Sequence, residues 1–400
     1  MVGNRIRQAR LAAGLTLDEV AQQLAASGQS ITKAGLSKYE NNRSTPKPSF
    51  LLHLGRVLGV RSSYFLTEPS VTIDWLCFRR HASLTQSRQE QIKALSARVV
   101  EAQVWLCSTL YPKQKPQFPR PAKTRVVEDA EDAAEALRKA WQLGEAPIES
   151  VTQSIEDHGG IVIGHREEGV KFDGLSGRAN RLFPVVVVNL GVPPDRRRYD
   201  LSHELGHLLL EFNGLPSKQQ EALAHRFAAA FLVPADVARA ELGPKRRSLS
   251  PEELGLLKQK HGLSMQAWAR RALDLSIIDQ GHYRSLCMTF NTRGWKRQEP
   301  FPFHCQEEPT RLKQMTLRAL AEGIITSERA EELCSGCIGG IKAAPARTLA
   351  SRPSARDLLR LPREERDRLL AAAAARAAKD YQINRELTAF EAFGESDLYD

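Results

Sequence analysis

The segment YDLSHELGHLLLE, residues 199–211, constrains the fold of this 400-residue chain more than any other part of it. His203 and His207 are four residues apart, so on a helix they share one face, where two imidazoles can bind one Zn²⁺. Leucines fill the other faces of the same helix. The pattern predicts a buried helix that presents polar groups to a cleft. The alternative is a core helix whose two histidines are satisfied by hydrogen bonds.

A zinc hydrolase needs a third protein ligand and an open fourth position. A second helix is predicted for residues 217–232, after an Asn-Gly turn and a proline, and it offers Glu221 and His225, again four residues apart. Glu221 follows His207 by fourteen residues, which is enough for an antiparallel return across the first helix. Glu204, beside the first histidine, is placed to take a proton from a water molecule at the metal.

Several strings around these helices occur in a recognisable order: GGIVIGH, KFDGLSG and PVVVVNL, then RRRYDLSHELGHLLLEF, then EALAHRFAAAFLVP. Over residues 146–279 they resemble the ImmA/IrrE family of zinc metallopeptidases. The resemblance implies an α+β, zincin-like domain with two or three small strands before the active helix. It also implies that His203, His207 and Glu221 are zinc ligands. Glu204 would be the general base.

Two residues near the predicted centre leave alternatives open. The family often has Asn or Asp at the position of His225, so this histidine either orients a metal ligand or competes for the metal. Tyr199 lies one helical turn before the first histidine, where it either packs as an aromatic residue or donates a hydrogen bond to an oxyanion.

Residues 4–60 have the pattern of four or five short helices. The string TLDE, residues 16–19, is a capping box that opens a helix over residues 17–25. A third helix is predicted for residues 32–41, with an inner face formed by Ala34, Leu36 and Tyr39. Two short helices around a polar turn, the second rich in Lys, Ser and Asn, indicate a helix-turn-helix.

The third helix carries the predicted DNA contacts. Groove-facing candidates are Thr32, Lys33, Ser37 and Lys38, and phosphate-facing candidates at the helix end are Asn41, Asn42 and Arg43. The strings GLTLDEVAQQL and LSKYENNRSTPKPSFLLHLGRVLGV resemble the Cro/repressor-like (XRE) domain, an all-α bundle. The resemblance implies binding to double-stranded DNA, and we also expect a homodimer. The alternative is a small helical interaction module that no longer binds DNA.

The charge of the chain is concentrated at its N-terminal end. Residues 1–125 hold 19 Lys and Arg against 7 Asp and Glu, whereas the whole chain has a net charge of +10. A basic front end favours contact with a polyanion. The chain has no apolar run of roughly 18 to 20 residues and only six scattered cysteines. These features exclude membrane-channel and disulfide-scaffold classes and predict a cytoplasmic protein.

We predict a multidomain, mainly α chain. The expected parts are a helix-turn-helix domain (1–66), a helical connector and Pro-rich linker (67–124), a zinc peptidase domain (125–280), a helical C-terminal region (281–340), and a linker with an amphipathic helix and acidic tail (341–400). The motif Cys334-Ser-Gly-Cys337 either joins His304 and Cys305 in a second zinc site or forms a helix-end turn with reduced thiols.

The acidic tail carries Phe390, Phe393 and Tyr399 among its carboxylates. It is similar to the C-terminal tails of bacterial antitoxins, which implies a toxin nuclease as a partner. The alternative is a solvated terminal helix with a disordered end.

Three functional hypotheses follow. The first is a cytoplasmic, DNA-binding transcription regulator with a zinc endopeptidase of narrow specificity, which cleaves a helix-turn-helix repressor in a stress, mobile-element or toxin–antitoxin circuit. The second is a transcription factor whose peptidase-like domain senses a ligand or metal. The third is an antitoxin that regulates its own gene. The complete set of predicted ligands and base favours the first hypothesis over the second.

Overall fold

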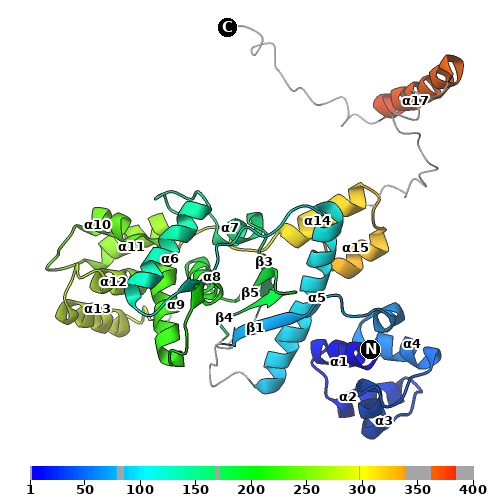
Figure 1. Cartoon of the computed structure of the whole chain (residues 1–400), viewed down its shortest axis with the longest axis horizontal. Helices are drawn as coiled ribbons and strands as arrows, with labels where there is room; N and C mark the ends of the chain where they lie inside the picture. Colours follow the sequence, from blue (N-terminus) through cyan, green and yellow to red (C-terminus); the bar gives the residue numbers. More distant parts are fainter. Residues whose placement is uncertain (1, 79–84, 167–171, 297, 338–361, 384–400) are drawn as a thin grey trace. The chain divides into compact units, whose positions relative to one another are not determined.

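The computed structural model describes residues 2–78, 85–166, 172–296, 298–337 and 362–383. The chain divides into two units, residues 1–340 and residues 341–400. The first unit is mainly helical with a small mixed sheet near its middle, as expected from the sequence (Figure 1). No helix among these described residues is long and apolar enough to cross a membrane.

The N-terminal bundle has four α-helices and a short 3₁₀-helix: α1 (Val2–Ala12), α2 (Leu17–Ala26), α3 (Lys33–Glu40), α4 (Pro48–Leu58) and η1 (Ser62–Leu66). Its core contains Ile6, Leu24, Leu36, Leu54 and Phe65. The predicted capping box is present, because Thr16 and Glu19 satisfy each other's backbone N–H groups. The prediction for Ala34 is wrong: this residue is exposed, and the inner face of α3 is formed by Leu36 and the half-buried Tyr39.

The sheet has the strand order β1-β4-β5-β3, with bounds β1 (Ile73–Phe78), β3 (Ile161–His165), β4 (Gly174–Ala179) and β5 (Phe183–Asn189). Strand β3 is parallel to β5, whereas β4 is antiparallel to both of its neighbours. The valines of β5 alternate between two cores, with Val185 and Val187 on one face and Val186 and Val188 on the other. The continuous valine run therefore reflects a strand that is covered on both faces.

The segment expected to be a helical connector contributes a strand to this sheet. Strand β1 pairs with β4, and Ile73 and Trp75 pack against the core beneath it. A Cβ at Gly177 would lie 2.8 Å from the carbonyl oxygen of Asp74, so the glycine is what allows β1 to approach β4 this closely. This partner is about a hundred residues distant in sequence, so the local pattern of β1 alone did not predict the pairing.

Helices cover both faces of the sheet (Figure 1). Helix α5 (Gln86–Leu110) packs on one face, and α8 (Pro194–Leu209) packs on the other. The end of the Pro-rich linker is also ordered, since β2 (Ala122–Lys123) pairs with β6 (Leu210–Glu211) directly after α8. The other helices are α6 (Val127–Ala140), α7 (Val151–Asp157), α9 (Ser217–Leu232), α10 (Ala235–Leu242), α11 (Pro251–His261), α12 (Met265–Asp274), α13 (Gln280–Thr292), α14 (Arg311–Ala321), α15 (Ser327–Leu333) and, in the second unit, α17 (Arg363–Ile383).

The cysteine motif lies in a turn directly after α15, as one of its two alternatives expects. Cys334 and Cys337 face each other across this turn, with their Cα atoms 5.5 Å apart. Among the described residues, they form no metal-binding group with His304 and Cys305. The acidic tail, with its predicted toxin contact, lies outside the described residues.

Three buried glutamates fix the segment that precedes α14 to the central domain. Each carboxylate accepts backbone N–H groups at the start of a helix: Glu299 at α12, Glu307 at α7, and Glu156 at α14. Such carboxylates satisfy N–H groups that have no partner within the helix and interact favourably with its dipole. The C-terminal helical region is thereby part of the same unit as the sheet.

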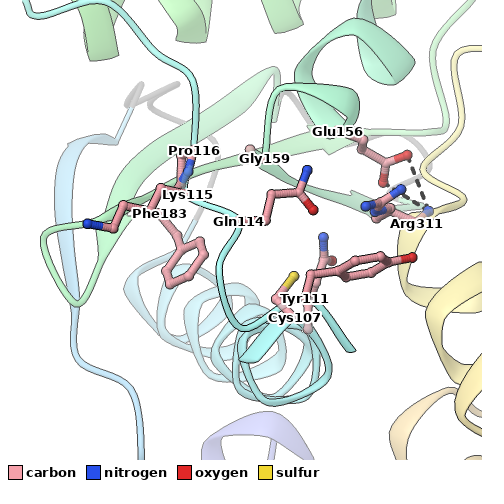
Figure 2. A pocket seen from close by; sticks show the side chains of 11 residues that line it. Cys107, Tyr111, Gln114, Lys115, Pro116, Glu156, Gly159, Phe183 and Arg311 are labelled. Carbon is pink, nitrogen blue, oxygen red and sulfur yellow. Dashed lines mark hydrogen bonds between the residues drawn. The ribbon is translucent and has the colours of Figure 1, made fainter. Parts of the chain in front are cut away.

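Glu156 lies beside a small pocket between α5, the Pro-rich linker and α14, close to Arg311 (Figure 2). Burial raises the pKa of Glu156 to about 7, although its hydrogen bonds from the backbone N–H groups of Thr310 and Arg311 act in the opposite direction. Because the folded pKa lies above the ordinary value of 4.5, the folded state holds the proton more tightly than the unfolded state. This contribution to stability is complete below about pH 4.5 and is lost as the pH rises through about 7.

We therefore predict that Glu156→Gln flattens the pH dependence of stability. Between pH 5 and 8 the variant should lose about 3 kcal/mol less of its free energy of unfolding than the wild type. Urea unfolding across this range measures the difference, and Glu149→Gln, which removes an exposed carboxylate that does not act on Glu156, is the control. Parallel curves for wild type and Glu156→Gln would contradict the raised pKa.

Candidate metal centre and DNA interface

Helices α8 and α9 form a closely packed antiparallel pair that builds the candidate centre. Pro194 starts α8, and the Asn213-Gly214 turn and Pro216 return the chain into α9. A Cβ added at Gly206 would come within 3.2 Å of the Cα of Ala224 on α9. The glycine between the two histidines therefore allows the helices to approach closely enough for side chains near their ends to meet.

The three predicted ligand residues converge between these helices. The Nε2 atoms of His203 and His207 are 3.0 Å apart, and the carboxylate oxygens of Glu221 lie 3.3 and 3.4 Å from them. Their candidate ligand atoms all lie within 4.8 Å of one another, and this is the only such group among the described residues. Two imidazole nitrogens and a carboxylate form a donor set suited to Zn²⁺.

The electrostatics of the cluster favour a bound cation. Hydrogen bonds to His203 and His207 hold the pKa of Glu221 well below its usual range, so its carboxylate is charged. Both histidines are buried, whereas Glu221 is partly exposed, which leaves the cluster open to solvent on the α9 side. The cluster therefore places the negative charge of Glu221 next to the imidazole nitrogens of His203 and His207, at a site that is partly open to solvent.

Glu204 lies beside His203 on α8, and its side chain lies against β4 of the sheet. Its side chain is buried, at 2% exposure, and its Oε2 atom has no hydrogen-bond partner among the described residues. A Cβ at Gly174 of β4 would be 2.8 Å from its Oε1 atom, so only glycine at this position leaves room for the carboxylate. A buried carboxylate oxygen without a partner indicates a missing water, ion or ligand.

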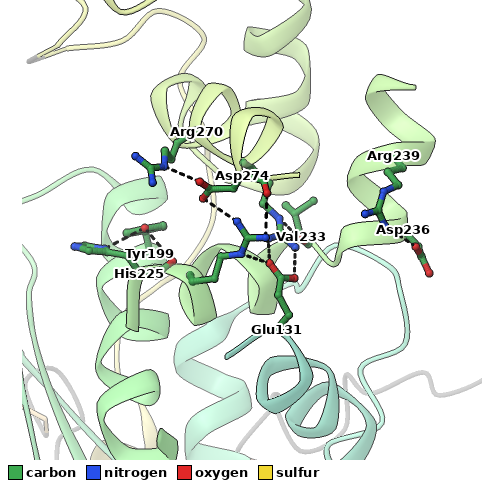
Figure 3. A network of polar contacts seen from close by, with 10 residues as sticks. Glu131, Tyr199, His225, Val233, Asp236, Arg239, Arg270 and Asp274 are labelled. Atoms are coloured by element: carbon green, nitrogen blue, oxygen red, sulfur yellow. Dashed lines mark hydrogen bonds and ion pairs between the residues drawn. The ribbon is translucent and has the colours of Figure 1, made fainter. Parts of the chain in front are cut away.

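The pair Tyr199 and His225 forms the next layer along the two helices (Figure 3). The Tyr199 hydroxyl is 3.1 Å from Nδ1 of His225, and the His225 ring lies 4.3 Å from the His203 ring, centroid to centroid. His225 is not part of the group whose ligand atoms converge. The geometry thus favours a His225 that packs beside the ligand residue His203 over a His225 that competes for the metal. The hydroxyl of Tyr199 is directed to His225.

A partly buried ionic network, which sequence reasoning missed, positions α9. Arg226 pairs with Glu131 of α6 and with Asp274 of α12, and Arg271 also pairs with Glu131 (Figure 3). Arg271 is fully buried and donates in addition to the carbonyl oxygen of Val233. The partners of Arg226, which are Glu131 and Asp274, lie far from it in the sequence and belong to no motif, so only the folded structure identifies the network.

The predicted DNA-contact residues divide into exposed and structural groups. Lys38 is exposed and Ser37 is half-buried on α3, whereas Thr32 caps this helix by accepting the N–H group of Gly35. Lys33 forms an exposed ion pair with Asp18 of α2, at 2.5 Å. Among these four side chains, Lys38 is thus the exposed one that neither caps the helix nor forms an ion pair within the described residues.

The residues after α3 help to hold the bundle together. Asn42 accepts the N–H group of Gly3 with its side-chain oxygen, at 2.9 Å, and so ties the end of α3 to α1. The side-chain amide of Asn41 donates to the carbonyl oxygen of Ser37 at 2.8 Å. Arg43 is exposed beyond them. Of the three predicted phosphate-contact residues, Arg43 is the one that these hydrogen bonds do not involve, and contact with phosphate stays a prediction.

Comparison with protein families agrees with this division. Residues 2–62 match the model of a helix-turn-helix domain, and residues 160–273 match that of a peptidase family described as the IrrE N-terminal-like domain. No curated protein matches the chain. The acidic tail lies outside both matches, so its similarity to antitoxins stays a prediction. The chain therefore combines an N-terminal helix-turn-helix domain with a central IrrE/ImmA-like peptidase domain.

Proposed function

We propose that this protein is a DNA-binding transcription regulator that carries a zinc-dependent endopeptidase of narrow specificity. The observation that carries the proposal is the convergence of His203, His207 and Glu221 beside the buried Glu204. Catalytic zinc sites use three protein ligands of these types and keep a further position open. The partnerless oxygen of Glu204 supports a site that is completed by water and substrate.

In the proposed reaction, zinc at this centre would supply Lewis acidity that makes water more acidic and polarises a peptide carbonyl. Glu204 acts as the general base: its carboxylate takes a proton from the attacking water and passes it to the leaving amine. Gly174 keeps the space that this carboxylate occupies. His225, held by Tyr199, packs against His203 and restrains its ring.

We propose a helix-turn-helix repressor as the substrate, in a cytoplasmic stress, mobile-element or toxin–antitoxin circuit. The helix-turn-helix domain in the same chain supports this choice, because it can bring the peptidase to the DNA, or to a related dimeric repressor, where the substrate is bound. Homodimerisation through this domain belongs to the same proposal.

The first prediction from this proposed function concerns the metal content of the purified protein. We expect about one zinc per chain in the wild type, and loss of affinity by orders of magnitude in His203→Ala, His207→Ala and Glu221→Ala, because each removes one of three ligands. Elemental analysis of the purified protein after dialysis measures the content. His225→Asn is the matched control and should retain zinc. Stoichiometric zinc in both His203→Ala and His207→Ala would refute the ligand assignment.

The second prediction concerns Glu204. Glu204→Gln should lower proteolysis by about 10²- to 10⁴-fold, because glutamine cannot accept the proton, while zinc content and DNA affinity stay unchanged. Gly174→Ala should produce the same loss, since the added Cβ displaces the Glu204 carboxylate. Quantitative proteomics of helix-turn-helix repressors in cells that express each variant measures the effect. Repressor levels that are the same with wild type and Glu204→Gln would contradict the peptidase function.

The third prediction concerns DNA. The full-length protein should bind a duplex from upstream of its own gene with an affinity that falls steeply with salt, because phosphate contacts release counterions. Lys38→Ala should reduce the slope of log affinity against log salt by about 0.9, whereas Ser37→Ala should change sequence preference. Lys139→Ala, an exposed change on α6, is the control. Affinity that does not change with salt would remove the DNA-binding proposal.

A further inference from the structure

Arg178 of β4 is a half-buried cation without an acidic partner among the described residues. Its Nη2 atom donates to the carbonyl oxygen of Leu208 at 2.7 Å, and this is the one hydrogen bond of its side chain in the described part of the chain. Burial lowers its pKa, and no neighbouring carboxylate offsets the effect. The buried arginines Arg5 and Arg271, by contrast, each have a glutamate partner. Burying an uncompensated charge is costly, so the position calls for an explanation.

Capping of α8 explains only part of this arrangement. The carbonyl of Leu208 belongs to the last turn of α8, where the helix dipole favours a cation. The contact uses one of the five N–H donors of the guanidinium, however, and leaves most of its planar fork without a protein acceptor. A single helix cap therefore does not account for an arginine here.

The location of Arg178 points to the candidate metal centre. Successive residues of a strand face opposite sides, and Leu175 and Ala179 pack into the core on the α5 side. Gly174, Ser176 and Arg178 therefore face α8. Gly174 touches Glu204, and Leu208, the acceptor of Arg178, directly follows His207.

Ser176 supplies an independent sign of a missing ligand on the same face. It is fully buried, and its Oγ atom has no hydrogen-bond partner in the described part of the chain. It lies between Gly174, which borders the carboxyl group of Glu204, and Arg178. The hydroxyl of Ser176 and the guanidinium of Arg178 on this face of β4, and the facing carboxylate of Glu204 on α8, thus all lack partners for part of their hydrogen-bonding capacity among the described residues.

We propose that Arg178, assisted by Ser176, binds a carboxylate of the peptide substrate, so that the peptidase selects an aspartate or glutamate side chain near the scissile bond. This proposal rests on the proposed peptidase function. A guanidinium fork matches a carboxylate in a bidentate contact, and the bound anion would supply the charge that Arg178 lacks. The Ser176 hydroxyl can donate to the same carboxylate or to the adjacent peptide group.

Binding to synthetic peptides tests the proposal without requiring turnover. The probes are degenerate nonapeptide libraries in which one position is fixed as Asp, Glu, Asn, Gln or phosphoserine. The full-length, zinc-loaded Glu204→Gln variant is titrated against each library by fluorescence anisotropy. We expect Asp or Glu at one position to bind about tenfold or more tightly than Asn or Gln, since a charge-assisted contact is lost with the amide.

Variants of Arg178 in the same background identify the residue responsible. Arg178→Met, which keeps an apolar stem and removes the charge, should abolish the acidic preference, and Arg178→Lys should retain part of it. Arg181→Met is the matched control, because it removes an exposed arginine from the hairpin that follows β4 and should leave the preference intact. Thermal midpoints and zinc contents of Arg178→Met and Arg181→Met show whether both variants are folded.

The outcomes separate this proposal from the peptidase function. Equal binding of acidic and amide libraries, or an acidic preference that survives in Arg178→Met, overturns the carboxylate site. If Arg178→Met binds all libraries equally more weakly and has a lower thermal midpoint, Arg178 is only a helix cap and the carboxylate site is overturned. Tighter binding of phosphoserine peptides than of both Asp and Glu peptides also overturns the site. Wild-type protein is tested for cleavage of the same libraries. If acidic peptides bind more tightly but the wild type cleaves none of them, the carboxylate site stands and the peptidase function is rejected. If the wild type cleaves peptides but shows no preference for acidic ones, the peptidase function stands and the carboxylate site is rejected.

Discussion

The close packing of α8 against α9 is the constraint on which the candidate centre depends. Gly206 lets α9 approach, and this approach brings Glu221 to the Nε2 atoms of His203 and His207. The ionic network of Glu131, Arg226, Arg271 and Asp274 holds α9 in register with α6 and α12. On its other side α8 is fixed by β4, where Gly174 makes room for Glu204. Helix α8 thus carries the two histidines that meet α9 and the glutamate that meets β4.

The helix-turn-helix domain is joined to this assembly by a buried contact. Arg5 of α1 pairs with Glu101 of α5 at 2.7 Å, and it also donates to the carbonyl oxygens of Thr67 and Glu68, just before β1. Helix α5 in turn packs on the sheet whose opposite face meets α8. The DNA-binding domain is therefore anchored to the sheet by packed elements, which distinguishes it from a module on a flexible tether.

Sequence predicts the parts of this protein whose signals are local. The capping box of Thr16 and Glu19 and the helical spacing of the two histidines depend on residues within one or two turns, and the structure contains both features. Strand β1 was missed because its partner Gly177 is remote in sequence. The same reason applies to Glu131 and Arg178, whose surroundings come from several distant elements, so neither belongs to a recognisable motif. Their roles follow only from burial and from the partners that the fold provides.

X-ray absorption spectroscopy of the zinc-loaded, full-length protein tests the central claim most directly, because it reports the atoms around the metal. The account predicts scattering from two imidazole groups and from oxygen ligands, with distances of about 2.0 to 2.2 Å and no sulfur shell. A sulfur shell at about 2.3 Å would instead place the metal at cysteines. A coordination sphere with no imidazole scattering would likewise contradict a centre built from α8 and α9.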